Sequence, residues 1–145
     1  QDPIFGSQFH QSLEEVKWPQ ALQSLVLGDR FNQSLDEVNL PITLQSLAFG
    51  HDFNQSLEQV KLPNDLKDLT FSGRFNQSLD QVNLQSLCSL TLGREFNQSL
   101  DRVNFPHSLQ SLTFGDSFNQ RLDLVVLPHN LKILAFGASF SQSLD

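Results

Sequence analysis

The amino-acid sequence predicts a β-rich solenoid of about six and a half coils, each 22 residues long, with parallel strands. Three observations lead to this fold class. The pentapeptide Phe-Asn-Gln-Ser-Leu begins at Phe31, Phe53, Phe75 and Phe96, and variants of it begin at residues 9, 118 and 140. Apolar residues keep to the same few positions of every copy, and most copies carry a Pro and a Gly at fixed positions.

We expect a single repeat domain over residues 1–145. Its coils begin near residues 9, 31, 53, 75, 96 and 118, and partial coils lie at both ends. One step is 21 residues instead of 22, because the fourth copy lacks the residue that aligns with Pro. Since the sequence begins with Gln1 and stops at Asp145, halfway through a coil, we expect a fragment or a processed product of a longer chain.

The elements of one coil follow from the second copy. A short extended segment is predicted over residues 34–38. After a proline come the eight residues 42–49, which are too few for a helix of ordinary length. Within them Leu47 and Phe49 alternate with small residues, the period of two that is typical of a strand with one buried face. Gly50 is then expected to supply a turn.

The predicted core consists of seven apolar positions in each copy. All 13 Phe and 25 of the 26 Leu fall in these positions. A stacked solenoid requires this regularity, because one coil cannot bury its apolar face alone and identical coils stack identical side chains into columns. The narrow composition, with no Met and no Tyr, is therefore a consequence of the repeat.

The block at residues 44–55, Leu-Gln-Ser-Leu-Ala-Phe-Gly-x-x-Phe-Asn-Gln, resembles the FNIP repeat, a 22-residue variant of the leucine-rich repeat. The resemblance covers essentially the whole chain. It implies a leucine-rich-repeat-like stack and a non-catalytic scaffold or interaction surface, with no catalytic residues to transfer. One departure is a Ser at positions 34, 56, 78 and 99, where the family often has Pro.

Composition excludes several classes of function. The net charge is −7 and the nine Lys and Arg residues are scattered, which argues against a nucleic-acid partner. One Cys excludes a disulfide framework and a cysteine zinc site, and no apolar run approaches the roughly 18 residues of a membrane span. Because no phosphate-binding loop or isolated acid–base pair is present, we predict no catalytic, cofactor or metal site and no enzyme.

An asparagine recurs at the second position of the repeat. We predict an inward-facing structural ladder in which each amide bonds backbone groups left unpaired by the corner. The alternative is N-glycosylation, because the first four are followed by Gln-Ser and form acceptor sequences. An inward Asn cannot carry a glycan, so the ladder is favoured. The ladder residues are Asn32, Asn54, Asn76, Asn97 and Asn119.

The sixth position is acidic in all seven copies. One interpretation is a column that binds cations, since hard cations prefer several carboxylate oxygens. The favoured interpretation is a hydrated edge in which each carboxylate accepts a backbone N–H, with Lys17, Lys61 and Arg102 offsetting part of the charge. Calcium is not expected, because the Gly-rich spacing of calcium-binding repeats is absent. The acids are Glu14, Asp36, Glu58, Asp80, Asp101, Asp123 and Asp145.

Residues that break the pattern are the candidates for a protein interface. In the sixth copy Leu124, Val126 and Ile133 stand where the other copies have polar or charged residues, and Ile133 lies beside Ala135. Exposed apolar residues on a repeat protein mark a partner interface or a contact with the next segment of the chain.

The predicted function is that of a non-catalytic interaction or structural scaffold. We expect an accessory subunit of a larger assembly that docks a protein partner through its apolar last coil and its flat strand face. The alternative is a cation-binding or extracellular adhesion module that uses the acidic column.

Overall fold

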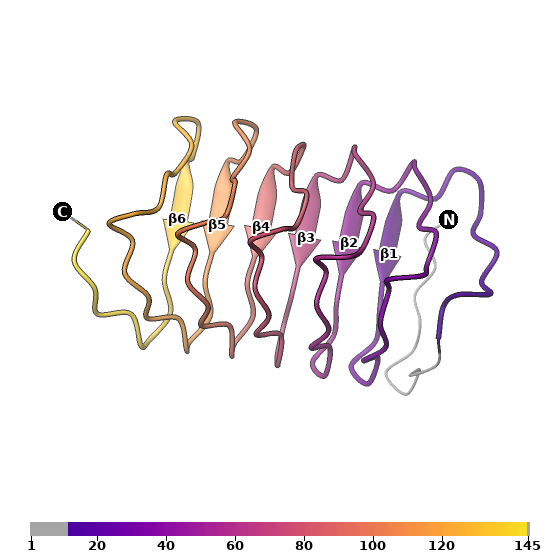
Figure 1. Ribbon diagram of the computed structural model, residues 1–145, viewed down its shortest axis with the longest axis horizontal. Helices are drawn as coiled ribbons and strands as arrows, with labels where there is room; N and C mark the ends of the chain where they lie inside the picture. The colour runs from indigo at the N-terminus through magenta and orange to yellow at the C-terminus, as the bar shows by residue number, and fades with distance from the viewer. Residues whose placement is uncertain (1–11, 145) are drawn as a thin grey trace.

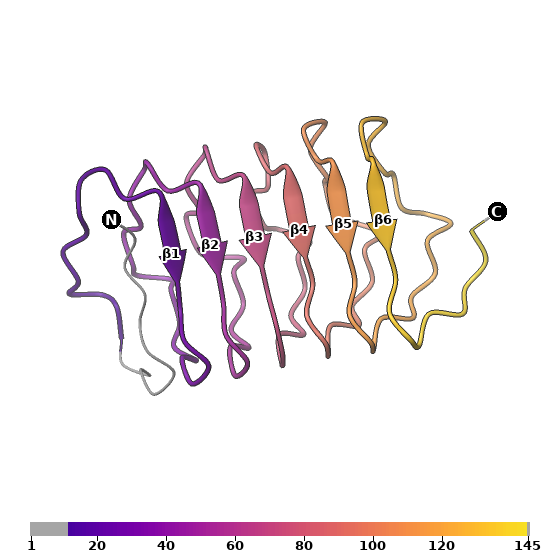
Figure 2. The same ribbon diagram turned by 180° about the vertical axis from the view of Figure 1, so that it is seen from behind.

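The computed structural model describes residues 12–144, which form one sheet of six short parallel strands (Figure 1). The strands are hydrogen-bonded in the order of the sequence, and each coil leaves the sheet, returns on the other side and re-enters beside the previous strand (Figure 2). This confirms the predicted parallel solenoid. The strands are β1 (Ser24–Val26), β2 (Ser46–Ala48), β3 (Asp68–Thr70), β4 (Ser89–Thr91), β5 (Ser111–Thr113) and β6 (Ile133–Ala135).

The register of the sheet follows the repeat, and each coil is named below after the Phe that begins it. Equivalent leucines pair from strand to strand, including Leu69 with Leu90 across the shortened copy. In that copy the turn before the strand closes on the carbonyl of Leu84 rather than on a proline carbonyl, so the missing residue leaves the sheet unchanged. The six strands enclose five complete turns, slightly fewer than expected, because part of the first coil lies outside the described residues.

The extended segment predicted over residues 34–38 is wrong. The chain turns there, because the Val38 N–H donates to the Leu35 carbonyl at 3.0 Å. The Ser34 hydroxyl also accepts the Asp36 N–H at 3.1 Å, a local bond that competes with a strand. Ser12, Ser56, Ser78 and Ser99 make the same bond in their copies. The Phe118 coil forms the same turn with Arg121 at this position, since the Val125 N–H donates to the Leu122 carbonyl at 3.1 Å, so the serine bond supports the bend but is not required for it.

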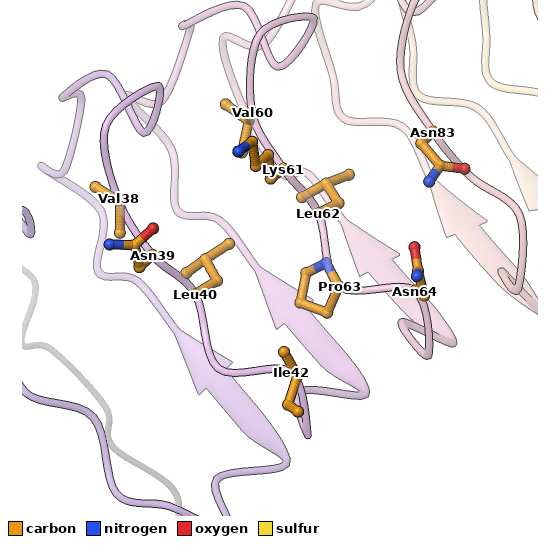
Figure 3. Close-up of a pocket in the computed structure, with 10 residues that line it drawn as sticks. All are labelled: Val38, Asn39, Leu40, Ile42, Val60, Lys61, Leu62, Pro63, Asn64 and Asn83. Carbon is orange, nitrogen blue, oxygen red and sulfur yellow. The ribbon is translucent and has the colours of Figure 1, made fainter.

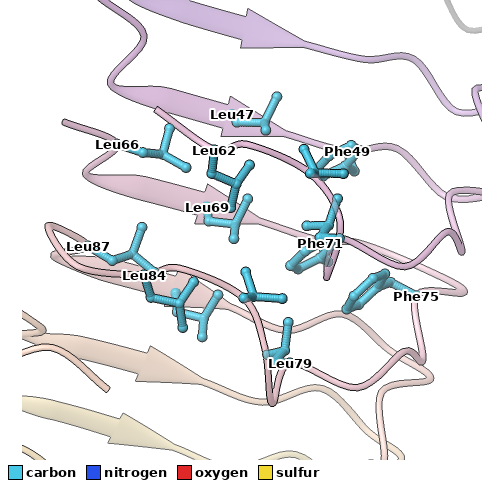
Figure 4. Packing of buried hydrophobic residues seen from close by; sticks show 14 of the residues in the cluster. Leu47, Phe49, Leu62, Leu66, Leu69, Phe71, Phe75, Leu79, Leu84 and Leu87 are labelled. Carbon is cyan, nitrogen blue, oxygen red and sulfur yellow. The ribbon is translucent and has the colours of Figure 1, made fainter. Parts of the chain in front are cut away.

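Leucine and phenylalanine columns form the core of the stack (Figure 4). The phenylalanines that begin the coils lie 6.1–6.2 Å apart with nearly parallel rings. A second phenylalanine stacks beside this column in some coils. The ring centroids of Phe71 and Phe75, for example, are 3.8 Å apart. Burying such a side chain contributes about 1.5–3 kcal/mol, so contact between coils supplies most of the stability.

The glycine that follows each strand is required by close approach of two coils. No glycine in residues 12–144 has a positive φ, so the expected role in turn conformation is not what selects glycine. A Cβ on Gly115 would lie 2.4 Å from the carbonyl oxygen of Gly93 in the preceding coil. In the third copy Gly73 makes the equally close approach, to the His51 carbonyl, which accounts for the exchanged order of Ser72 and Gly73.

Candidate functional site

The last coil differs from the inner coils in the exposure of its core. Leu109 and Leu112 of the Phe96 coil are fully buried. Their equivalents Leu131 and Leu134 in the Phe118 coil are only partly buried. Phe140 is likewise partly exposed, although the residues at its position in the inner coils are buried. The side of the last coil that faces away from β5 is therefore an open apolar surface.

The candidate interface residues all belong to the Phe118 coil. Leu124 is 68% exposed, Val126 is 83% exposed and Ile133 is 56% exposed. Ile133 lies on β6, whereas Leu124 and Val126 lie in the segment that returns behind the sheet, on either side of the partly buried Val125. Ala135 is half-buried at the end of β6, and its carbonyl accepts the Phe114 N–H at 2.9 Å. The structure thus distributes the candidates over two sides of one coil.

An exposed apolar residue that the sequence reasoning missed is Ile42, which is 85% exposed. It lies in a groove of about 620 Å³ between the Phe31 and Phe53 coils, beside Leu40, Leu62 and Pro63 (Figure 3). The signal was available, because the other copies have a polar residue at this position. A similar groove of about 680 Å³ follows two coils later and contains Phe105. Both grooves are open and shallow, unlike an enzyme pocket.

At the asparagine corner, each side-chain oxygen accepts two bonds from the next coil. Asn54 Oδ1 accepts the Asn76 N–H at 2.9 Å and the Gln77 Nε2 at 3.0 Å. The bond to the backbone N–H recurs at 2.8–3.0 Å from Asn32 to Asn119. In the partial coil that begins at Phe140, Ser141 replaces the asparagine and its N–H donates to Asn119 Oδ1.

The expectation that these amides face inward is wrong. Asn32 and Asn97 are exposed, the other ladder residues are half-buried, and residues 12–144 contain no buried polar side chain. The corner places the amide at the rim of the coil, where its oxygen reaches the next coil without entering the core. Burial therefore no longer argues against a glycan, and glycosylation stays a prediction.

The acidic column is arranged differently from the expected hydrated edge. The backbone N–H of Asp36 donates to Ser34, whereas its carboxylate makes no hydrogen bond in the described structure. Glu58 does accept a backbone N–H, from Gln81 at 3.3 Å. In residues 12–144 no ion pair joins the column to the expected lysines or to Arg102, but Arg121 pairs with Asp123 at 2.7 Å. The last acid, Asp145, lies outside the described residues.

No group of three His, Cys, Asp or Glu side chains in residues 12–144 comes together as a metal site. His107 and His129 are exposed, His10 lies outside the described residues, and Cys88 is half-buried with its Sγ 3.8 Å from the Ser86 carbonyl. The cation-binding alternative stays a prediction. The described residues also contain no helix with the length and apolar character that crossing a membrane needs.

At the corner that follows the first strands, Arg30, Asp52 and Arg74 hold the same repeat position in successive coils, so the sign of the charge alternates. His51 Nδ1 lies 2.8 Å from Asp52 Oδ1, and this hydrogen bond lowers the pKa of Asp52 below its ordinary value. Arg74 and Arg30, which flank Asp52 in the neighbouring coils, act in the same direction. Ala138 and Ser139 occupy this corner in the last coil, which therefore lacks the alternating charges.

Comparison with known proteins agrees with this geometry. The FNIP repeat family matches residues 9–52, 53–94, 85–117 and 118–145. The chain belongs to the FNIP repeat family. Its structure is similar to the crystal structure of CroV588, described as a novel circular LRR protein, with a TM-score of 0.88 and 41% sequence identity. The similarity covers 98% of this FNIP chain but only 21% of CroV588. No curated protein matches the chain.

Proposed function

We propose that this FNIP chain is a non-catalytic interaction scaffold that serves as an accessory subunit of a larger assembly. The observation that carries the proposal is the last coil, where Leu124, Val126 and Ile133 are exposed in positions that are polar in the other copies. Exposed apolar side chains lower the solubility of a free surface and favour contact with another one. Repeat folds of this class commonly present such surfaces to proteins.

The mechanism is display of a rigid surface. The sheet presents small side chains such as Ser46, Ala48 and Thr113 on its outer face, while the central leucine of each strand points into the core. Such a face is flat and suits contact with another broad surface better than enclosure of a small molecule. The apolar last coil would supply the binding energy, and the sheet face would widen the contact.

A capture experiment tests this proposal. The variant carries Leu124→Gln, Val126→Asn and Ile133→Ser, each residue being one that other copies have at that position. We expect the triple variant to capture at least tenfold less protein from the native extract than the unmodified chain does, because the exposed apolar contacts are removed. The circular dichroism spectrum should be unchanged, since none of these side chains is buried.

The matched control is Ile42→Asn, which removes an isoleucine that is even more exposed than Ile133, from the coil of β2, four strands away from β6. It should leave capture intact. Equal capture by the triple variant and the unmodified chain would show that the last coil is not the docking surface.

A further inference from the structure

We infer that Asn32 and Asn97 are acceptor sites for N-linked glycans and that these glycans coexist with the asparagine ladder. Both residues are followed by Gln and Ser, as are Asn54 and Asn76, and no other Asn in the sequence begins such an acceptor sequence. All four lie in coils that precede the Phe118 coil. The inference is therefore independent of the docking role proposed for that coil.

The ladder fixes the orientation of each amide. Two donors of the next coil converge on Asn32 Oδ1, the Asn54 N–H at 2.8 Å and the Gln55 Nε2 at 3.1 Å. Because both donors are N–H groups, the atom that faces them must be the amide oxygen, and the amide nitrogen Nδ2 points away from them. Asn97 is held in the same way, by equivalent bonds of 2.9 Å and 3.1 Å.

The nitrogen that would carry the glycan is not used by the described part of the chain. Nδ2 of Asn32 and Nδ2 of Asn97 make no hydrogen bond within residues 12–144, whereas other asparagines, such as Asn130, do donate through Nδ2. Asn32 and Asn97 are exposed, and so are Ser34 and Ser99, the serines that complete their acceptor sequences. Both acceptor nitrogens are therefore available at the surface of the folded stack.

N-glycosylation leaves the ladder bonds intact. In the transfer, a bond forms between Nδ2 and the anomeric carbon of the first sugar of a lipid-linked oligosaccharide. The bond from that carbon to the phosphate oxygen breaks, the lipid diphosphate leaves, and Nδ2 loses one proton. The product is still an amide, so its Oδ1 keeps the lone pairs that accept the two N–H groups. A glycan on Asn32 therefore removes no hydrogen bond between the coils.

The four acceptor sequences differ in the room that they offer. Asn54 and Asn76 are half-buried, and each lies one coil away from an exposed member of the ladder. The phenylalanine rings that begin these coils are 6.1 Å apart at each step, which is too close for bulky glycans on neighbouring asparagines. Asn32 and Asn97 are three steps apart. One glycan on each of these two residues satisfies both exposure and spacing.

The serine of the acceptor sequence is not required by the fold. In the Phe118 coil Arg121 stands at its position, yet the Val125 N–H still donates to the Leu122 carbonyl at 3.1 Å in the same turn. Asn119 of that coil also keeps its ladder bond, to the Ser141 N–H at 3.0 Å. Replacing the serine by alanine therefore removes an acceptor sequence while leaving both the turn and the ladder in place.

Secretion of the 145-residue chain from a eukaryotic host that attaches N-linked glycans, behind a removable leader peptide, tests the inference. A peptide N-glycosidase converts each glycosylated Asn to Asp, so peptide mass spectrometry measures the occupancy of each site. We expect two glycans per chain, on Asn32 and Asn97, and a much lower occupancy of Asn54 and Asn76.

Matched variants separate the acceptor sequence from the ladder. Ser34→Ala with Ser99→Ala should lose both glycans, whereas Ser34→Thr with Ser99→Thr should keep them. Amide exchange at Asn54, whose N–H donates to Asn32, should be as slow in the glycosylated chain as in the unglycosylated one. Unmodified Asn32 and Asn97, equal occupancy of all four sites, glycans that persist in the alanine variant, or faster exchange at Asn54 in the glycosylated chain would each overturn the inference.

Discussion

The Phe96 coil and the Phe118 coil have the same pattern of apolar residues but different environments. In the first, Leu109 and Leu112 are fully buried because coils lie on both sides. In the second, Leu131 and Leu134 have a complete neighbour on one side only and remain partly exposed. The difference shows that a coil does not bury its own core. Burial, and with it stability, is a property of the contact between neighbours.

The largest expected difference between the two coils concerns their central leucines. Leu112→Ala should lower the free energy of unfolding by about 2–5 kcal/mol, because it leaves a cavity between two covered coils. Leu134→Ala should cost about 1–2 kcal/mol, because the side chain is already partly hydrated. Urea denaturation at low protein concentration measures both values. Equal losses of unfolding free energy in the two variants would contradict the expected difference between the coils.

The glycine contacts give the next effect. Gly115→Ala should cost at least about 1–3 kcal/mol, because the added Cβ meets backbone rather than a movable side chain. Ser139→Ala, at an exposed position of the last coil, is the control and should be nearly neutral. Thermal unfolding of both variants checks the prediction. A neutral Gly115→Ala would mean that neighbouring coils can separate locally at no cost.

The asparagine ladder compares an inner member with the last one. Asn97→Ala should lower the free energy of unfolding by about 1 kcal/mol, because Asn119 N–H and Gln120 Nε2 lose their acceptor and have only partial access to water. Ser141→Ala should change it by a few tenths of a kcal/mol at most, about the usual range for surface sites. Denaturant titration of both variants tests the prediction, and equal effects would contradict it.

The smallest effect is expected at the charged corner of the inner coils. The folded pKa of Asp52 is lowered, so its contribution to stability is present above the pKa of an unfolded Asp and is lost as the pH falls through the folded pKa. The unmodified chain should therefore exceed Asp52→Asn slightly in melting temperature near neutral pH, and the gap should close in acid. A gap independent of pH would show that the carboxylate charge does not matter.

Much of the fold could be predicted because the repeat constrains it. The alternation around Leu47 predicted a strand, and the structure has one at Ser46–Ala48. The prediction of an extended segment over residues 34–38 was wrong, because a local turn and a bond to a serine hydroxyl outweigh a short apolar alternation there. The prediction that the asparagine amides face inward was also wrong. The sequence shows that a polar residue recurs, but not which side of the corner it occupies.

The candidate site could be predicted only in part. Leu124 and Val126 are visible in the sequence because they replace polar residues in a regular pattern. The partly exposed core at Leu134 is not visible, since the residue is the same leucine that is buried in every inner coil. Exposure there depends on the neighbouring coil, and that information lies in the stack rather than in the local sequence. Ile42 could have been found by the same comparison of copies.

Amide hydrogen exchange along the stack tests the central claim most directly. The Phe114 N–H donates to the Ala135 carbonyl of the next coil, whereas the equivalent Phe136 N–H has no backbone partner within residues 12–144. We predict that in the 145-residue chain the Phe114 amide is strongly protected and the Phe136 amide exchanges much faster, because protection comes from the neighbouring coil. Equal protection of Phe114 and Phe136 would contradict the claim that each coil is completed by its neighbour.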